Sequence, residues 1–329
     1  NLMVRQKAQS IIIGLLVSGT IGVTLAYHGY SYWGIATQSL TYVITVMTCY
    51  WFFSPWRPTF HFNLKPLRGM ISFSSKMLAT NIFNHLNNNI FSIILGKFYS
   101  EKEVGFYNQA NKWNYMGHSL VSGMINGVAQ PVLAQVTDDK ERQLRVFRKM
   151  MRFTAFVSFP AMFGLSLIAP ELITIAITDK WIESAQILQL LCISGAFIPI
   201  TALCSNLVIS KGKSNIYMWN TIALSLSQLF GAYLLYPYGI IPMLYAFISI
   251  NMGWTFVWLH FIQKEIKLSL PNFLKDISPY LLLSIACIFA CSFITEPIEN
   301  VGLRLIGKIS IVGLFYIAIL WKANSTILQ

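Results

Sequence analysis

Long apolar stretches dominate the chain, and each has the length of a helix that crosses a lipid bilayer. A spanning helix needs about 20 mainly apolar residues, because only a helix satisfies its own backbone hydrogen bonds in hydrocarbon. Ten segments of this kind occur, at residues 8–27, 33–54, 76–97, 109–133, 152–174, 185–209, 216–236, 239–262, 277–295 and 303–321. The third and fourth are the least apolar because both are rich in asparagine. The pattern predicts an all-α, polytopic membrane protein with ten transmembrane helices.

The composition agrees with a membrane protein. Only 11% of the 329 residues are charged and the mean hydropathy is +0.57, whereas soluble domains carry about 25% charged residues. So few charges exclude a cytosolic enzyme, a secreted domain and a disordered regulator. The five cysteines lie mostly in apolar stretches, without the spacing of a zinc site or a disulfide framework. We interpret them as small apolar side chains and expect no metal and no cofactor.

Lysine and arginine fall mainly on one side of the predicted membrane. If the ten segments alternate in direction, 18 of the 24 basic residues lie on one side and five on the other, with Lys112 inside the fourth segment. Because cytoplasmic connections are enriched in Lys and Arg, we expect both termini of this chain in the cytoplasm. This topology also accounts for the net charge of +12, so no nucleic-acid partner is expected.

Two of the cytoplasmic connections are longer than the others. Residues 55–75 carry three prolines and are expected to link two groups of helices. Residues 136–152 place Leu144, Phe147 and Met151 on one helical stripe, with arginines elsewhere. This pattern predicts an amphipathic helix that lies on the anionic membrane surface. The connections on the opposite side are short, so no soluble domain is expected there.

The chain carries no recognisable catalytic motif, and we predict that it is not an enzyme. Gly302, Gly307 and Lys308 imitate a phosphate-binding loop, but Ile309 stands where such a loop needs a hydroxyl for magnesium. The acidic residues lie in connections or near helix ends, with Glu171 the nearest to membrane depth. Proton-coupled transporters usually keep a carboxylate inside the membrane, so this distribution does not favour proton coupling within the ten segments.

Polar side chains nevertheless form stripes on the third and fourth segments. An isolated polar residue such as Asn206 or Asn251 is interpreted as a hydrogen bond between helices. The clustered amides exceed what helix packing requires and would be unfavourable facing lipid, so we predict that they line a water-filled cavity. The candidate substrate-binding residues are Asn81, His85, Asn88, Asn111, Lys112, Asn114 and His118. For Lys112 two roles stay open: extension of its ammonium group to the membrane surface, or binding of a phosphate.

One protein family is recognisable in the sequence, most clearly in GKFYSEKEVGFYNQANKW (96–113), QPVLAQV (130–136), FPAMFGLSLIAPELI (159–173) and ISKGKSNIYMW (209–219). These stretches resemble the bacterial polysaccharide and O-antigen flippases, which are lipopolysaccharide biosynthesis membrane proteins of the multidrug/oligosaccharidyl-lipid/polysaccharide exporter superfamily. The likeness covers nearly the whole chain. Because it rests on glycines, prolines and aromatic residues, it indicates fold and family better than substrate.

The resemblance implies a two-lobed transporter of fourteen helices, of which this chain would hold the last ten. Residues 1–54 would be the last two helices of the N-terminal lobe, and 55–75 the cytoplasmic linker. Residues 76–262 would be the six-helix C-terminal lobe, and 263–329 two extra C-terminal helices. The first residue is Asn1 rather than methionine, in line with the expectation that four helices precede this sequence.

The function implied by the resemblance is translocation of a polyprenyl-diphosphate-linked oligosaccharide across the bacterial inner membrane, for synthesis of O-antigen, exopolysaccharide or capsule. The implied partners are this lipid-linked sugar, the bilayer and the polysaccharide polymerase machinery. Amides suit the hydroxyls of such a headgroup, and cations suit its diphosphate. The alternative is a cation-coupled, multidrug-type antiporter of the same superfamily, which an intramembrane carboxylate upstream of residue 1 would favour.

Overall fold

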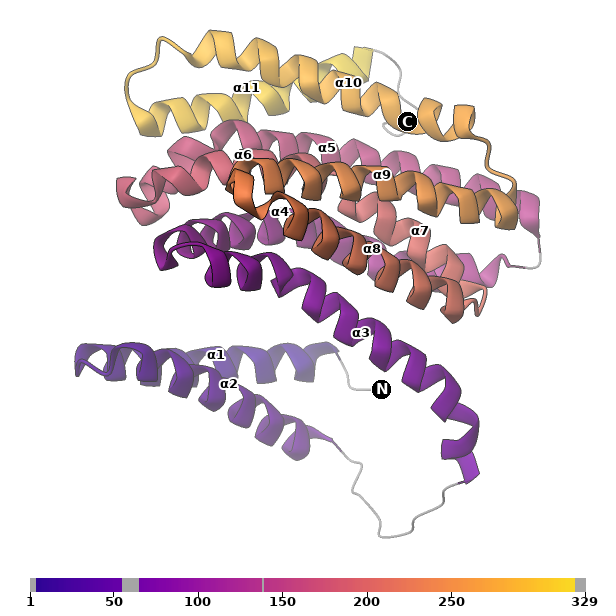
Figure 1. Cartoon of the computed structure of the whole chain (residues 1–329), viewed down its shortest axis with the longest axis horizontal. Helices are drawn as coiled ribbons and strands as arrows, with labels where there is room; N and C mark the ends of the chain where they lie inside the picture. The colour runs from indigo at the N-terminus through magenta and orange to yellow at the C-terminus, as the bar shows by residue number, and fades with distance from the viewer. Residues whose placement is uncertain (1–3, 55–64, 138, 323–329) are drawn as a thin grey trace. The chain divides into compact units, whose positions relative to one another are not determined.

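The computed structural model describes residues 4–54, 65–137 and 139–322, and all regular structure among them is helical. The all-α prediction is therefore confirmed. The chain divides into two compact units, Asn1–Leu67 and Arg68–Gln329, whose helices are labelled in Figure 1. Nearly all residues of the ten predicted segments lie in α-helix, and one segment is divided between two helices.

The first unit is a hairpin of two helices, α1 (Val4–Tyr27) and α2 (Ser31–Phe53). The turn between them contains Gly29, whose φ of +83° is easily adopted only by glycine. The helices approach closely at Gly22, where an added Cβ would lie 2.7 Å from Gln38 Oε1. Small residues are usual at such crossings, because van der Waals packing holds membrane helices together.

The second unit begins within α3 (Lys65–Phe98), which starts earlier than the apolar pattern predicts. Residues 65–75 of the expected linker are helical, because Pro66 lies in the first turn, where the missing N–H has no partner to lose. Residues 55–64 of that linker lie outside the described part of the chain. α4 (Glu101–Gln135) follows, and its start is stabilised by a capping box between Ser100 and Glu103.

α5 (Lys140–Ile177) is one continuous helix of 38 residues. It joins the predicted surface helix (136–152) to the predicted span (152–174). The apolar stripe of the surface helix faces protein, since Phe147 and Met151 are completely buried. The prediction of a helix on the membrane surface is therefore wrong. An apolar stripe beside basic residues also occurs where a helix enters a protein core with its charges at the rim.

Segment 185–209 is predicted as one span, but the structure divides it into α6 (Ile182–Gly195) and α7 (Ile198–Ser210). Pro199 lies in the first turn of α7 and has no N–H to continue the hydrogen bonds of α6. Residues 179–210 still have the length and hydropathy of one span, and they are more buried than the other candidate spans. The break therefore lies in the core of the second unit.

The remaining helices are α8 (Ser214–Leu235), α9 (Ile240–Ile266), α10 (Leu270–Thr295) and α11 (Val301–Lys322). α5 runs through the middle of the second unit and packs against α4, α6, α10 and α11. α9 packs against α6, α7 and α8, while α4 packs against α6 and α7. In Figure 1, α10 and α11 lie on one side of α5, and α8 and α9 on the other.

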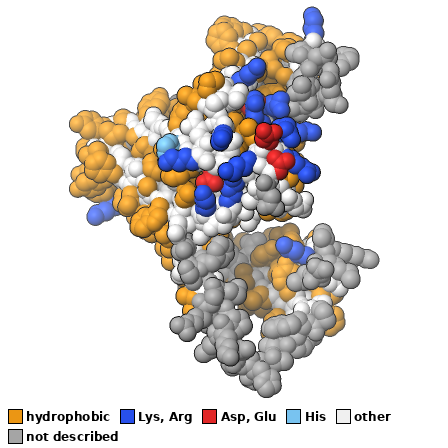
Figure 2. Space-filling view, turned by 90° about the vertical axis from the view of Figure 1, so that its right-hand side faces the viewer, with side chains coloured by type: hydrophobic (Ala, Val, Ile, Leu, Met, Phe, Trp, Pro, Cys, Tyr) orange, Lys and Arg blue, Asp and Glu red, His pale blue; other side chains and the backbone are white. Residues whose placement is uncertain are grey.

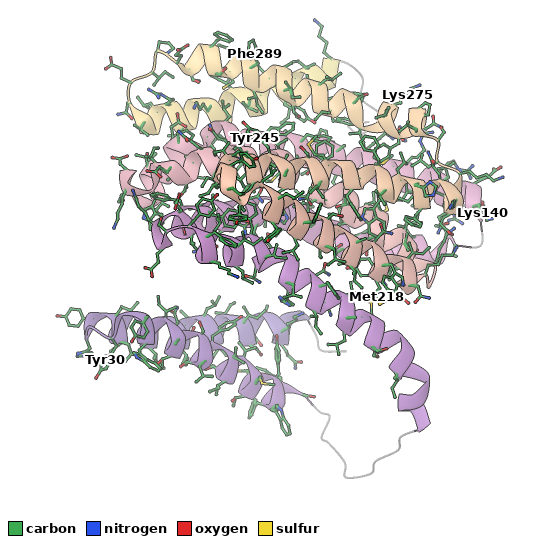
Figure 3. The ribbon with its side chains drawn as sticks, viewed as in Figure 1. Tyr30, Lys140, Met218, Tyr245, Lys275 and Phe289 are labelled. Carbon is green, nitrogen blue, oxygen red and sulfur yellow. The ribbon has the colours of Figure 1, made fainter. Side chains whose placement is uncertain are left out.

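Six parts of the described chain are long and apolar enough to cross a membrane: Gln6–Tyr27, Lys140–Ile177, Asp179–Ser210, Ile240–Ile266, Leu270–Thr295 and Val301–Leu320. α2, α3, α4 and α8 are not among them. For α3 and α4 the asparagines predict this result. The segments of α2 and α8 were predicted to be more apolar than these two, but Ser, Thr, Gln and Tyr interrupt both helices. Large apolar side chains such as Tyr245 and Phe289 are exposed (Figure 3). The chain is that of a multi-pass membrane protein.

One end of the second unit carries a concentration of basic residues. α4 and α9 end there, α5 and α10 begin there, and Figure 3 labels Lys140 and Lys275 at this end. Figure 2 views the same end and shows Lys and Arg side chains crowded together with few acidic ones. We call this the basic end, formed by Lys140, Arg142, Arg145, Arg148, Lys149, Lys211, Lys213, Lys264, Lys267 and Lys275.

Candidate functional site

A polar cavity of about 440 Å³ lies among α3, α4, α7, α8 and α9 of the second unit. Amides and hydroxyls from all of these helices except α9 line it. They belong to Asn84, Asn126, Gln130, Thr201, Ser205, Asn206, Asn220 and Thr221. Tyr217, Trp254 and Trp258 supply its aromatic wall. None of the side chains that line this cavity is charged.

Helical spacing explains why these side chains meet. Residues three or four apart share one face of a helix, and Trp254 and Trp258 of α9 are four apart, as are Thr201 and Ser205 of α7. α8 and α9 form a hairpin, so the start of α8 lies beside the end of α9. Tyr217 therefore reaches Trp258, with 6.3 Å between the ring centroids.

The cavity offers hydrogen-bonding groups that the protein does not use. Asn206 Nδ2 donates to Asn126 Oδ1 at 2.8 Å and to a carbonyl of its own helix, which ties α7 to α4. The side-chain amides of Asn84 and Gln130 form no hydrogen bond with another described residue. Trp254 Nε1 is buried and likewise without a partner. Asn84 is half-buried and Gln130 is exposed, so their amides are available to water or to a polar ligand.

The hydroxyls of the cavity present mainly acceptors. Those of Thr201, Ser205 and Thr221 donate their protons to backbone carbonyls one turn earlier. Their oxygen lone pairs stay available, because a hydroxyl that donates once still accepts twice. The amides add both donors and acceptors, so the wall matches a ligand with many hydroxyl groups.

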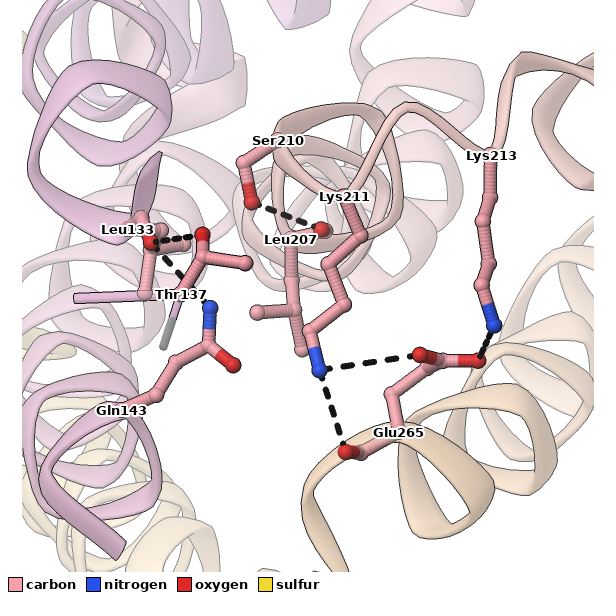
Figure 4. Close-up of polar contacts among 8 residues, drawn as sticks. All are labelled: Leu133, Thr137, Gln143, Leu207, Ser210, Lys211, Lys213 and Glu265. Carbon is pink, nitrogen blue, oxygen red and sulfur yellow. Dashed lines mark hydrogen bonds and ion pairs between the residues drawn. The ribbon is translucent and has the colours of Figure 1, made fainter. Parts of the chain in front are cut away.

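The turn between α7 and α8 is fastened to the end of α9, as Figure 4 shows. Lys211 and Lys213 flank Gly212, which has a φ of +71°, and both lysines contact Glu265. Lys211 Nζ lies 3.1 Å from the Glu265 backbone oxygen and 3.6 Å from its Oε2. Burial lowers the pKa of Lys211, and the carboxylate of Glu265 opposes that shift. These contacts hold the helix ends that carry the aromatic wall.

None of the seven predicted substrate-binding residues lines this cavity. Asn81, His85 and Lys112 are exposed, Asn111 is half-buried, and the side chain of Asn88 lies outside the described residues. The cavity is reached instead by neighbouring members of the same two polar stripes. A role for the seven residues in substrate binding stays a prediction.

The other two predicted residues, Asn114 and His118, lie at helix-packing positions. Asn114 is buried against Gly195, where an added Cβ would collide with Asn114 Oδ1 and would lie 2.6 Å from Met162 Cε. His118 is half-buried, and its Nδ1 is buried without a hydrogen-bond partner. Its ring contacts the edge of Tyr115 at 5.4 Å.

The aromatic wall is not predicted by the sequence pattern. Tyr217, Trp254 and Trp258 lie in apolar stretches, where an aromatic residue normally packs in the core or faces lipid. The available signal was the spacing of the two tryptophans on one face, together with Asn220 on the neighbouring helix. Without knowing which helices are adjacent, that spacing does not point to a cavity.

Two of the acidic residues near helix ends, Asp276 and Glu171, are buried. Asp276 lies inside α10 with its side chain 4% exposed, and it binds Arg148 of α5 through two hydrogen bonds of 2.6 and 3.0 Å. Glu171 of α5, 5% exposed, binds Lys308 of α11 at 2.7 Å and lies 3.9 Å from Arg304. We call these contacts the two ion-pair clamps, because each fastens α10 or α11 to α5.

Residues 2–186 of the chain match a protein family described as "Polysaccharide biosynthesis protein". This match covers more than half of the chain. The chain belongs to the polysaccharide biosynthesis protein family.

Several curated proteins are similar in sequence to this polysaccharide biosynthesis protein. The teichuronic acid biosynthesis protein TuaB of Bacillus subtilis is 27% identical over 82% of the chain and 56% of its own length. The lipopolysaccharide biosynthesis protein WzxC of Escherichia coli is 25% identical over 62% of the chain and 43% of its own length. The succinoglycan biosynthesis transport protein ExoT of Rhizobium meliloti is 23% identical over 65% of the chain and 44% of its own length. The chain spans about half the length of these curated relatives.

The fold of this polysaccharide biosynthesis protein is similar to that of a solved membrane protein. The inward closed conformation of the lipid II flippase MurJ superposes with a TM-score of 0.72 at 17% sequence identity. The match covers 98% of this chain and 67% of MurJ. At this identity the likeness shows the fold alone.

Proposed function

We propose that the chain serves as a flippase that moves a polyprenyl-diphosphate-linked oligosaccharide across the bacterial inner membrane for surface polysaccharide synthesis. Membership of the polysaccharide biosynthesis family and the likeness to TuaB, WzxC, ExoT and MurJ support this proposal. The observation that carries it is the uncharged, amide-lined cavity inside a helical bundle that includes candidate membrane spans at α7 and α9. In this role the protein is a transporter and not an enzyme.

The physical demands of that task match the cavity. A sugar headgroup presents many hydroxyls, and each would lose its hydrogen bonds in hydrocarbon. Amide and hydroxyl side chains replace those bonds with water excluded, while the polyprenyl tail stays in the bilayer. Alternating access then needs only the movement of one group of helices against another.

We further propose the two-lobed, ten-span architecture for this chain. Residues 1–54 are the last helices of an N-terminal lobe, 55–75 a linker, 76–262 a C-terminal lobe and 263–329 an extra pair of helices. The helices found at all ten predicted segments support this arrangement. Under the positive-inside rule the basic end faces the cytoplasm, so both termini of the chain lie there. The polymerase machinery that extends the exported sugar is the proposed protein partner.

A cation-coupled antiporter receives less support from the described residues. A cavity for cationic compounds needs negative charge, and no acidic side chain lines this one. The buried carboxylates of Glu171 and Asp276 already contact cations of the protein. We propose that Lys112, which lies nearer the start of α4 and so away from the basic end, binds the diphosphate at a later stage of translocation, outside the uncharged cavity.

Export in cells tests the proposal. The full-length protein that carries this chain is expressed in a strain from which it was deleted, and surface polysaccharide and lipid-linked intermediate are both measured. Asn220→Leu, inside the cavity, should lower surface polysaccharide strongly and cause the intermediate to accumulate. Asn215→Leu is the matched control, because Asn215 lies exposed on the same helix. Normal export by Asn220→Leu at normal protein level would contradict the proposal.

A further inference from the structure

We propose that the aromatic wall of the cavity (Tyr217, Trp254 and Trp258) is a recognition subsite for one uncharged sugar ring, occupied at the basic end before translocation. This inference rests on the proposed flippase function. Beyond that function, it states that the cavity binds the sugar and excludes the diphosphate. It also states that the sugar is recognised before translocation.

The first argument is the chemistry of the wall. One face of a pyranose ring is made of C–H groups with a slight positive polarisation, and the face of an aromatic ring carries the complementary negative potential. Tyr217 and Trp258 are inclined at 36° with centroids 6.3 Å apart, so they do not cover each other as a parallel stack would. Trp254 adds a third aromatic side chain to this wall.

The second argument is the arrangement of polar groups around the wall. A sugar bound by its apolar face turns its hydroxyls outward along the ring edge. Asn126, Asn206 and Asn220 line the same cavity and offer both donors and acceptors at such an edge. A volume of about 440 Å³ lies within the usual range for small-molecule sites. The cavity therefore suits part of an oligosaccharide and not the whole of it.

The third argument is the lack of charge among the lining residues. A diphosphate in this cavity would lose its hydration without meeting a cation, which is strongly unfavourable. An uncharged sugar loses only hydroxyl hydration, which the amides replace. The cavity thus selects the neutral part of the headgroup and leaves the diphosphate to be bound elsewhere.

The fourth argument is position along the helices. Gln130 and Asn206 lie in the last turns of α4 and α7, and Tyr217 lies in the first turn of α8. All of these helix ends converge at the basic end, which the positive-inside rule places toward the cytoplasm. Trp254 and Trp258 lie deeper, within α9, so the subsite extends from the basic end toward the middle of the bundle. We infer that a sugar ring enters it from the cytoplasmic side, before the headgroup crosses the membrane.

Binding to the purified full-length protein in nanodiscs tests the proposal. Two probes are compared by calorimetry: a polyprenyl diphosphate without sugar, and the same lipid carrying one neutral hexose. The wild type should bind the hexosyl lipid more tightly than the bare lipid. Trp258→Ala should reduce this gain in affinity by roughly tenfold, as expected when a stacking ring is lost, and should leave the affinity for the bare lipid unchanged. Trp254→Phe keeps an aromatic ring of smaller area, so a smaller loss is expected.

The control is Trp219→Ala, because Trp219 is 63% exposed on the same helix as Tyr217. It should preserve the full gain from the sugar. If the wild type binds neither lipid, the proposed function itself is overturned. If the wild type gains affinity from the hexose and Trp258→Ala keeps that gain, only the subsite is overturned. The subsite would also be overturned if Trp258→Ala lost the same affinity for both lipids. A third outcome against it is that Trp258→Ala keeps the gain from the sugar but loses binding of the cationic probe tetraphenylphosphonium.

Discussion

The two sides of α5 differ in the kind of buried polar group that they contain. Toward α10 and α11 the two ion-pair clamps match each buried carboxylate with at least one cation, although Glu171 Oε2 has no hydrogen-bond partner. On the side of α3, α4, α7, α8 and α9 most buried polar groups are uncharged, the Lys211–Glu265 pair at the basic end being an exception, and many have no hydrogen-bond partner. Buried atoms without one on this side belong to Trp113, Asn114, His118, Ser122, Gln228, Trp254 and Thr255.

The two regions also differ in the polarity of the hollows beside them. A groove of about 600 Å³ between α4, α5 and α11 has an apolar lining with Lys308 at its edge. The cavity on the other side is lined by amides, hydroxyls and aromatic rings. The paired charges hold α10 and α11 against α5, whereas the unpaired polar groups on the other side can bind a polar ligand. Four predictions test this contrast.

The largest expected effect is on the Glu171–Lys308 clamp. Lys308→Met leaves the Glu171 carboxylate buried with only Arg304 near it, and should lower the free energy of unfolding by about 3 kcal/mol. The double variant Lys308→Met/Glu171→Met removes both charges and should recover most of that loss. Unfolding by denaturant in detergent micelles measures both. Equal losses in the single and double variants would show that packing, and not the charge pair, holds α11 to α5.

A smaller loss is expected where the polar stripe of α4 meets α6. Gly195→Ala places a Cβ against Asn114 Oδ1 and Met162, and overpacking of this kind lowers stability by about 2 kcal/mol. Gly164→Ala is the control, since its Cβ would meet nothing within 4 Å. If Gly195→Ala unfolds at the wild-type temperature, Asn114 has room to move, and its assignment to packing is wrong.

A gain in stability is expected from one unpartnered amide. Gln228 is 2% exposed, and neither its Oε1 nor its Nε2 has a hydrogen-bond partner. Gln228→Met has a similar shape without the unsatisfied groups, so it should raise the free energy of unfolding by about 1 kcal/mol. The same denaturant titration measures the change. Destabilisation instead would mean that the amide is paired in the membrane, by water or by a ligand.

The smallest effect on folding is expected at Lys112, which is exposed and forms no ion pair with another described residue. Lys112→Ala should leave protein level and unfolding unchanged, yet should reduce glycan export through lost attraction to the diphosphate. Lys112→Arg should restore export because the positive charge returns. Unchanged surface polysaccharide in Lys112→Ala would assign this lysine to the membrane surface and not to the substrate.

Helix positions were largely predictable from the chain, since twenty apolar residues in a row have few alternatives. The polar stripes of α3 and α4 were also visible, and neighbours of the predicted residues, such as Asn84 and Asn126, do line the cavity. What the pattern did not show was which turns of each stripe meet α7 and α8. That depends on helix crossings, which periodicity along one helix does not contain.

Other features depend on contacts between distant parts of the chain. Glu171 and Lys308 are 137 residues apart, so no local pattern shows that a buried acid has a cation beside it. The stripe of Phe147 and Met151 was read as membrane-binding because a core-facing helix and a surface helix share the same periodicity. The break before Pro199 was hidden by the apolar residues on both sides.

Cysteine labelling tests most directly whether the cavity is wet and holds the sugar-bearing headgroup. Cys49 is replaced by alanine; the other four cysteines are buried and serve as background. A membrane-impermeant maleimide applied from the cytoplasmic side should label Ser205→Cys in the cavity, and should not label Leu226→Cys on the exposed apolar face of α8. Prior addition of the hexosyl polyprenyl diphosphate should protect Ser205→Cys from the reagent. No labelling of Ser205→Cys, or labelling that the lipid-linked sugar leaves unchanged, would contradict the account.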